Sequence, residues 1–118
     1  MTPEGRVKAK VRDLLNEYGS GLYHHWPVPS GYGRTTIDVL GCYRGFFFAI
    51  EAKAPKKKPT LRQSETLQDM GAAMGKTFVI DDVNSPVLGE LRAWLDNLKA
   101  TVNDRPHLTP DATNRRVL

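Results

Sequence analysis

A run of large apolar residues from Phe46 to Ile50 constrains the fold of this chain more than any other feature, because such a run is typical of a β-strand. The run ends in an acid and a lysine, within residues 51–53. A shorter run over residues 35–40 contains Asp38, and residues 41–45 supply turn material between the two runs. The chain therefore predicts a β-hairpin with an acidic residue on each strand.

The register of this hairpin decides whether the two acids meet. If Arg44 and Gly45 are the loop residues of a tight turn, opposed residues carry numbers that sum to 89, and Asp38 lies opposite Glu51. Opposed residues share a face and lie about 4.5–5.5 Å apart at Cα. Side chains alternate along a strand, so Lys53 points the same way as Glu51. A slip of one residue would move Asp38 to the other face.

Two carboxylates this close repel each other, and a partly buried pair needs a proton or a cation between them. The candidate ligands are all oxygens, which suits Mg²⁺ or Mn²⁺ and argues against zinc. Such an ion lowers the pKa of a bound water and stabilises charge on a phosphate. Lys53 would then orient the attacking water or neutralise the transition state.

Length and composition set the outer limits. With 118 residues and nothing in the sequence that suggests two domains, we expect one small domain. No apolar stretch approaches the ~20 residues of a membrane span, and the N-terminus lacks a signal-peptide core. We therefore expect a cytoplasmic protein with no membrane partner. The single cysteine, Cys42, excludes a disulfide or a cysteine-based metal cluster within one chain and is expected to be a small strand-end residue.

Basic residues are concentrated in the first half of the chain. Residues 1–62 carry 11 Lys and Arg against 5 acids, whereas residues 63–118 carry 6 against 8. The excess positive charge lies in the half that holds the candidate acids, as in proteins that approach a polyanion. Many solvated surfaces are equally basic, so charge alone does not identify the partner.

A first helix is predicted to begin at residues 2–4, with a cap, a proline and an acid, and to end at Gly19. Its apolar stripe comprises Val7, Val11, Leu14, Leu15 and Tyr18. Glu4 extends this stripe backwards at spacings of three and four, so it should face the body of the protein. Its carboxylate then either interacts with the helix dipole or lies beside a metal, and the sequence leaves both open.

Tandem histidines, His24 and His25, lie in a predicted strand over residues 22–26 that Pro27 and Pro29 terminate. Adjacent strand residues point to opposite faces, so the two cannot bind one ion without distortion. We expect structural or solvated histidines in preference to a contact with phosphate or substrate.

A basic loop follows the hairpin, with three lysines at residues 56–58 between two prolines. Its position beside the candidate acids predicts phosphate contacts and a salt-dependent affinity, although an isolated lysine run is more often solvated. The loop leads into a second helix at Thr60, whose spacing to Gln63 is that of a capping box. Gln63 therefore has a structural reason for its position.

The remaining elements complete a small sheet. The second helix continues to Gly75, which we expect in the left-handed conformation, and residues 77–80 form a buried strand before a third helix from residue 85. The order helix, three strands, helix, strand, helix predicts an α/β domain, a small mixed β-sheet flanked by helices, over residues 1–101. Apolar residues thin out afterwards, so residues 102–118 are expected to be flexible or an arm that orders on a partner.

This pattern resembles the core of the PD-(D/E)XK nuclease superfamily, in which an Asp on one strand precedes Glu-x-Lys on the next, a helix and a further strand. More narrowly, residues 51–53 followed by the segment Pro59 to Gln63 are similar to the virus-type replication-repair nuclease (VRR-NUC) domain, which has a Pro-Thr-x-x-Gln segment after its lysine strand. The resemblance covers about residues 4–80 and implies a restriction-endonuclease-like core. One departure is Ile37, which stands where the superfamily has a proline before the aspartate.

The resemblance implies a Mg²⁺- or Mn²⁺-dependent endonuclease that cleaves DNA. The implied metal ligands are Asp38, Glu51, the Ala52 carbonyl and Glu4, and the implied catalytic residues are Lys53, Gln63 and the two strand acids. We expect DNA to be bound by Lys56, Lys57, Lys58, Arg34 and Arg62. Standalone members occur in phages and bacteria, resemble Holliday-junction resolvases and act as homodimers. The implied substrate is therefore branched DNA such as a four-way junction, in the cytoplasm of a bacterium or a phage-infected host.

Two other functions stay open at this point. In a non-catalytic nucleic-acid-binding module, the basic loop would bind phosphate and the acid pair would be a relic or a structural ion site. In a structural or assembly protein, the tail would dock on a partner. Metal-dependent turnover would separate the nuclease from the nucleic-acid-binding module. Weak DNA affinity without metal binding would favour the structural or assembly protein.

Overall fold

The computed structural model describes residues 1–28 and 36–102. Its elements are, in order, α1 (Pro3–Asn16), the 3₁₀ turn η1 (Gly19–Gly21), β1 (Leu22–His25), β2 (Val39–Tyr43), β3 (Phe46–Ala52), α2 (Leu61–Ala72), β4 (Lys76–Ile80) and α3 (Pro86–Val102). None of the helices in these ranges is long and apolar enough to span a bilayer. Beyond Val102, the predicted tail lies outside the described residues.

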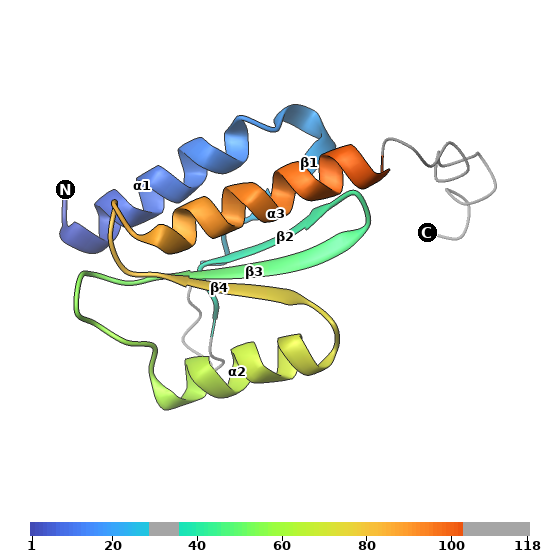
Figure 1. Cartoon of the computed structure of the whole chain (residues 1–118). Coiled ribbons are helices and arrows are strands. Elements are labelled where there is room, and N and C mark those ends of the chain that lie inside the picture. Colours follow the sequence, from blue (N-terminus) through green and yellow to red (C-terminus); the bar gives the residue numbers. More distant parts are fainter. Residues whose placement is uncertain (29–35, 103–118) are drawn as a thin grey trace.

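The strands form one mixed sheet in the order β1-β2-β3-β4. Strands β1, β2 and β3 are antiparallel neighbours, and β4 lies parallel to β3 after the crossover through α2. Helices α1 and α3 cover one face of the sheet and α2 lies on the other (Figure 1). This arrangement confirms an α/β fold with a small mixed sheet flanked by helices.

The central hairpin has the predicted register. Tyr43 pairs with Phe46, and Val39 pairs with Ile50, so paired numbers sum to 89 throughout. The loop residues Arg44 and Gly45 have φ values of +54° and +86°, as required in a two-residue turn whose twist matches that of the strands. The turn fixes the register, and the register decides which side chains meet at the far end of the hairpin.

Strand β3 is apolar from Phe46 to Ile50, and it is buried from Phe48 onwards, where helices cover both faces of the sheet. Phe48 and Ile50 belong to the larger core cluster with α1 and α3, while Ala49 packs in a smaller cluster with Leu67 of α2. Successive side chains of a strand point to opposite faces, so a strand at the centre of three layers has no solvent-facing side. A strand that alternated polar and apolar residues would not fit this position.

The helix ends follow local capping rules, with two corrections. Thr2 Oγ1 accepts a hydrogen bond from the Gly5 N–H at 3.0 Å and caps α1. Helix α1 ends at Asn16, before the predicted Gly19. After α2, the left-handed residue is Met74, with a φ of +72°, and the assignment of that conformation to Gly75 was wrong.

Gly75 instead provides space. A Cβ at this position would lie 2.7 Å from a ring carbon of Phe47 and 3.0 Å from the Met70 carbonyl oxygen. Glycine is therefore required here because the chain just before β4 lies against the Phe47 side chain of β3. The local sequence does not indicate this contact.

We expect Gly41→Ala to lower the free energy of unfolding by about 1–3 kcal/mol, because the backbone of Gly41 lies close to residues of both neighbouring strands. A Cβ on Gly41 would overlap the Phe48 ring and lie 2.7 Å from the Tyr23 carbonyl oxygen, so strand β2 would have to shift. Urea unfolding followed by circular dichroism measures the change. The matched control is Gly71→Ala in α2, where a Cβ meets nothing within 4 Å and a gain of about 0.5–1 kcal/mol is expected. Unchanged stability of Gly41→Ala would contradict the close packing.

Candidate functional site

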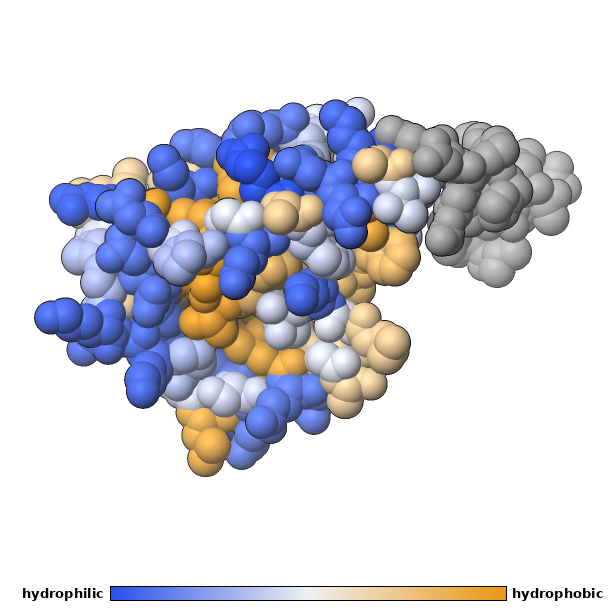
Figure 2. Space-filling model, in the orientation of Figure 1, coloured by the Kyte–Doolittle hydropathy of each residue, from blue (hydrophilic) through white to orange (hydrophobic). Residues whose placement is uncertain are grey.

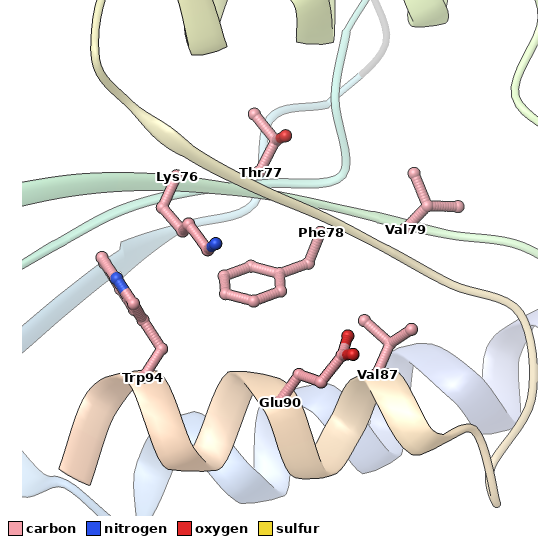
Figure 3. Close-up of a pocket in the computed structure, with 7 residues that line it drawn as sticks. All are labelled: Lys76, Thr77, Phe78, Val79, Val87, Glu90 and Trp94. Atoms are coloured by element: carbon pink, nitrogen blue, oxygen red, sulfur yellow. The ribbon is translucent and has the colours of Figure 1, made fainter. Parts of the chain in front are cut away.

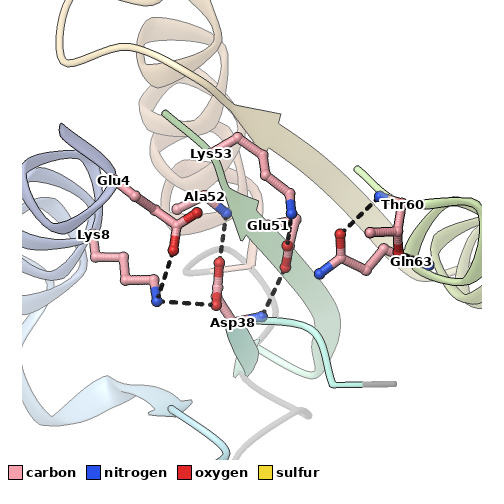
Figure 4. Close-up of polar contacts among 8 residues, drawn as sticks. All are labelled: Glu4, Lys8, Asp38, Glu51, Ala52, Lys53, Thr60 and Gln63. Atoms are coloured by element: carbon pink, nitrogen blue, oxygen red, sulfur yellow. Dashed lines mark hydrogen bonds and ion pairs between the residues drawn. The ribbon is translucent and has the colours of Figure 1, made fainter. Parts of the chain in front are cut away.

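The two acids of the hairpin meet at its open end (Figure 4). Asp38 directly precedes β2, and Glu51 is the penultimate residue of β3. The Asp38 N–H donates to Glu51 Oε1 at 3.1 Å, and the Ala52 N–H donates to Asp38 Oδ2 at 2.8 Å. The carboxylates thus continue the hydrogen bonding of the hairpin beyond its last backbone pair, and the structure brings together the acids that the register predicts.

Lys53 lies on the same side as Glu51, as strand alternation predicts. Its Nζ lies 3.3 Å from Glu51 Oε2, and its backbone N–H donates to the Ile80 carbonyl oxygen at 2.9 Å. The backbone hydrogen bond fixes the main chain of Lys53 against β4. The side chain of Lys53 is 14% exposed. The ammonium is therefore held beside the acids at the border of the core.

Burial raises the pKa of the Glu51 carboxyl to about 7, and the negative charge of Asp38 adds to this effect. The hydrogen bond from the Asp38 N–H and the Lys53 ammonium act in the opposite direction but do not restore the ordinary value. The side chain of Glu51 is only 2% exposed, so water does little to stabilise its charge. Carboxyl groups perturbed in this way are common at functional sites because a ligand or cation completes their environment.

A second lysine, Lys8, was missed by the sequence analysis. Its Nζ lies 3.3 Å from Glu4 Oε2 and 3.5 Å from Asp38 Oδ1. Burial lowers its pKa, but the carboxylates of Asp38 and Glu4 outweigh this effect and raise the pKa above its usual value. The available signal was the spacing of four residues from Glu4, which places Lys8 on the same helix face. Glu4 faces the body of the protein as predicted, and Lys8 lies between it and Asp38.

The oxygens present suit a magnesium-type ion. Each carboxylate oxygen of Asp38 and Glu51 accepts one contact from the protein, and a second lone pair remains on each. The Ala52 N–H points to Asp38. In an extended residue the carbonyl points to the same edge of the strand as the N–H, so the Ala52 carbonyl also faces Asp38. In the described part of the chain, no group of three or more His, Cys, Asp or Glu side chains is placed to hold a metal. An ion would bind through two carboxylates, a carbonyl and water, as Mg²⁺ often does.

No family model matches this chain, and no curated protein and no solved structure is significantly similar to it. The resemblance to the VRR-NUC domain therefore rests on the residues of this chain alone.

Gln63 has the predicted capping role. Its Oε1 accepts a hydrogen bond from the Thr60 N–H at 2.9 Å, and the Thr60 hydroxyl accepts one from the Gln63 N–H at 3.2 Å. This use of the oxygen leaves the amide nitrogen, which in Figure 4 points toward the side on which Glu51 and Asp38 lie. The cap holds the first turn of α2 beside the acids, so a structural role and a role at the site are compatible.

The basic loop adjoins the site. Lys56, Lys57 and Lys58 are exposed, and a turn with a hydrogen bond of 3.0 Å from the Lys57 N–H to the Ala54 carbonyl oxygen presents them to solvent. Hydrophilic side chains gather at this end of the molecule in Figure 2. Arg62 is also exposed, in the first turn of α2, whereas Arg34 lies outside the described residues.

The histidines are separate from the acids. The Trp26 N–H donates to His24 Nδ1 at 2.9 Å, so Nε2 carries the ring hydrogen and donates to Asn16 Oδ1 at 3.1 Å. Burial lowers the pKa of His24, and the nearby Arg12 guanidinium lowers it further. His24 is thus a neutral residue held in a hydrogen-bonded cluster, and His25 is exposed.

A cavity of about 480 Å³ lies elsewhere, between β4 and α3. Phe78, Val79, Val87 and Trp94 give it an apolar lining, with Lys76, Thr77 and Glu90 at its sides (Figure 3). None of the candidate site residues lines it. The described candidate site residues therefore lie outside this cavity.

Proposed function

We propose that this protein is a metal-dependent endodeoxyribonuclease with a PD-(D/E)XK core of the VRR-NUC type. The observation that supports this most is the meeting of Asp38 and Glu51 across one hairpin, with the Lys53 ammonium 3.3 Å from the buried acid. A structural ion pair alone would not require a second carboxylate in contact with Glu51, because that carboxylate makes the burial of charge more costly.

Each residue then has a role in hydrolysis of a DNA phosphodiester. Asp38, Glu51 and the Ala52 carbonyl would hold Mg²⁺ or Mn²⁺, which when bound supplies an activated water and stabilises charge on the phosphate. The Lys53 ammonium is placed to neutralise the charge that develops as the water oxygen joins phosphorus and the bond from phosphorus to the leaving oxygen breaks. The Gln63 amide would orient one of the groups at the site.

The substrate preference rests on the family resemblance. Standalone VRR-NUC domains resemble Holliday-junction resolvases, and a homodimer would place two sites on one branched DNA. The excess of basic residues in the first 62 positions agrees with a polyanionic partner. We propose four-way-junction DNA as the substrate, with the cytoplasm of a bacterium or phage-infected cell as the location.

Cleavage of labelled DNA tests this function. The protein is incubated with a four-way junction, a flap and a linear duplex, in Mg²⁺, Mn²⁺ or EDTA, beside a Lys53→Met variant. The proposal expects metal-dependent cleavage that needs Lys53, with paired symmetric cuts confined to the junction. Cleavage of all substrates alike would keep the nuclease and exclude the resolvase.

One observation favours a non-catalytic nucleic-acid-binding module instead. Every carboxylate oxygen of the acid pair already has a protein partner, so a metal is not needed to give these oxygens a contact. In that case, the basic loop would bind DNA while EDTA changed nothing. Binding without cleavage under every condition would decide for this module.

The basic loop should determine the salt dependence of DNA binding. We expect neutralisation of its three lysines to reduce the slope of log affinity against log salt by about 0.9 per lost phosphate contact, up to about 2.7. The variant is Lys56→Asn, Lys57→Ser, Lys58→Ser, because asparagine tolerates the φ of +69° at the first position. Fluorescence anisotropy with duplex DNA measures the slope. Lys99→Ser, in the last turn of α3, is the control, and an unchanged slope in the triple variant would exclude the loop from the interface.

A further inference from the structure

We infer that the Lys8 ammonium takes the place of a second metal ion at this site, so that each chain binds one divalent ion and Glu4 holds Lys8 instead of binding metal. The inference rests on the proposed metal-dependent nuclease and concerns Lys8, to which the family pattern assigns no role. It replaces the expectation that Glu4 is a metal ligand with a role for Glu4 in positioning Lys8.

The contacts place a cation where a second ion would otherwise lie. Lys8 Nζ is 3.3 Å from Glu4 Oε2 and 3.5 Å from Asp38 Oδ1, so it joins the helix acid to the strand acid. Lys53 contacts the other strand acid, Glu51, at 3.3 Å. Lys8 and Lys53 approach the acid pair from different sides in Figure 4, and the two strand carboxylates lie between them.

The charges of this cluster favour one ion. The three carboxylates of Glu4, Asp38 and Glu51 face the two ammonium groups of Lys8 and Lys53, which leaves one negative charge when all are ionised. One divalent ion gives the cluster one positive charge, which matches one phosphodiester. A second divalent ion would leave an excess of three positive charges and would have to displace Lys8 from Asp38.

The position of Lys8 is fixed by packing. Its neighbours on α1, Val7 and Val11, are fully buried in the core, so the helix face that carries Lys8 cannot turn away from the sheet. Lys8 and Glu4 are 36% and 43% exposed, and ion pairs this exposed contribute only about 0–1 kcal/mol to stability. Stability is therefore a weak reason for this arrangement, and a role at the acid pair is a stronger one.

Metal-binding stoichiometry tests the inference. Mn²⁺ is titrated into the full chain without DNA, by calorimetry and by electron paramagnetic resonance of the free ion. We expect one ion per chain in the wild type and in Lys8→Arg. In Lys8→Met we expect a second binding event, and an affinity for the first ion about tenfold higher because a nearby positive charge is removed. Adding Glu4→Gln to Lys8→Met should remove the second event.

Controls separate this effect from damage to the fold. Lys10→Met lies on the exposed side of the same helix and should bind one ion with wild-type affinity. Thermal unfolding checks each variant, and Lys8→Gln, which retains a hydrogen-bond donor, replaces Lys8→Met if that variant does not fold. Two ions in the wild type, or no second event in any folded variant that lacks the Lys8 charge, would overturn the inference.

The two proposals fail separately. One ion per chain with no cleavage of any DNA would refute the nuclease and leave the role of Lys8 intact. Two ions per chain with metal-dependent cleavage would keep the nuclease and refute the role of Lys8.

Discussion

Replacement of Lys53 by methionine is expected to lower the rate of DNA cleavage by about 10²–10³-fold, which is typical for removal of one group that stabilises transition-state charge. Methionine retains most of the volume of the lysine stem, so the packing around this side chain, which is 14% exposed, should persist. The backbone hydrogen bond from residue 53 to Ile80 does not depend on the side chain. The loss should therefore appear in the chemical step and leave folding intact.

Single-turnover rates at saturating Mn²⁺ measure this effect. Metal affinity should be retained or increased, because the Lys53 ammonium competes for Glu51 at 3.3 Å. Lys99→Met, in the last turn of α3, is the matched control and should change the cleavage rate little. A folded, metal-binding Lys53→Met protein that cleaves at the wild-type rate would remove Lys53 from the catalytic set.

Replacement of Glu51 by glutamine is expected to abolish metal-dependent cleavage and to stabilise the metal-free protein above pH 7 by about 1–3 kcal/mol. In the folded protein the pKa of Glu51 is about 7, against an ordinary value of 4.5. Between these values the folded state binds a proton that the unfolded state has lost. The free energy of unfolding of the wild type therefore falls as pH rises through this interval, by up to about 1.4 kcal/mol per pH unit, and is level above it.

The glutamine variant lacks this dependence. The free energies of unfolding of the two proteins should thus differ little from this cause below pH 4.5. They should differ most above pH 7, where the wild type carries a buried charge. Urea unfolding in EDTA from pH 4 to pH 8.5 measures the difference, with Glu65→Gln on the exposed side of α2 as the control. Mn²⁺ should stabilise the wild type at pH 8 and leave the variant unchanged. A variant less stable than the wild type at pH 8 would contradict a cost of burying Glu51.

Local sequence was sufficient for the hairpin and its acids. The turn at Arg44 and Gly45 requires positive φ at both positions, and this geometry permits one register. This register places Asp38 opposite Glu51, and strand alternation places Glu51 and Lys53 on the same side. The Thr60–Gln63 capping box was likewise predictable, because all of its hydrogen bonds join residues within one turn of helix.

Local sequence was insufficient where distant segments meet. Gly75 resembles a helix stop, yet its lack of a side chain serves a contact with Phe47 of β3, and the left-handed residue is Met74. Local rules also placed the end of α1 at Gly19, whereas the helix ends at Asn16 and a 3₁₀ turn intervenes. The role of Gly75 depends on packing between elements that local propensity does not describe.

The sequence by itself determined which residues pair across the central hairpin and that two acids and a lysine lie at its end, because turn geometry and strand alternation act over a few residues. Only the tertiary structure decided that Glu51 is almost fully buried and that Lys8 contacts Asp38 from another element. The burial of Glu51 follows from how α2 covers the sheet face that Glu51 shares with Ala49. The contact of Lys8 follows from how α1 packs on the other face, and it joins residues about 30 positions apart. The free energy of that packing depends on the whole set of apolar surfaces buried together, and no short stretch of sequence contains it.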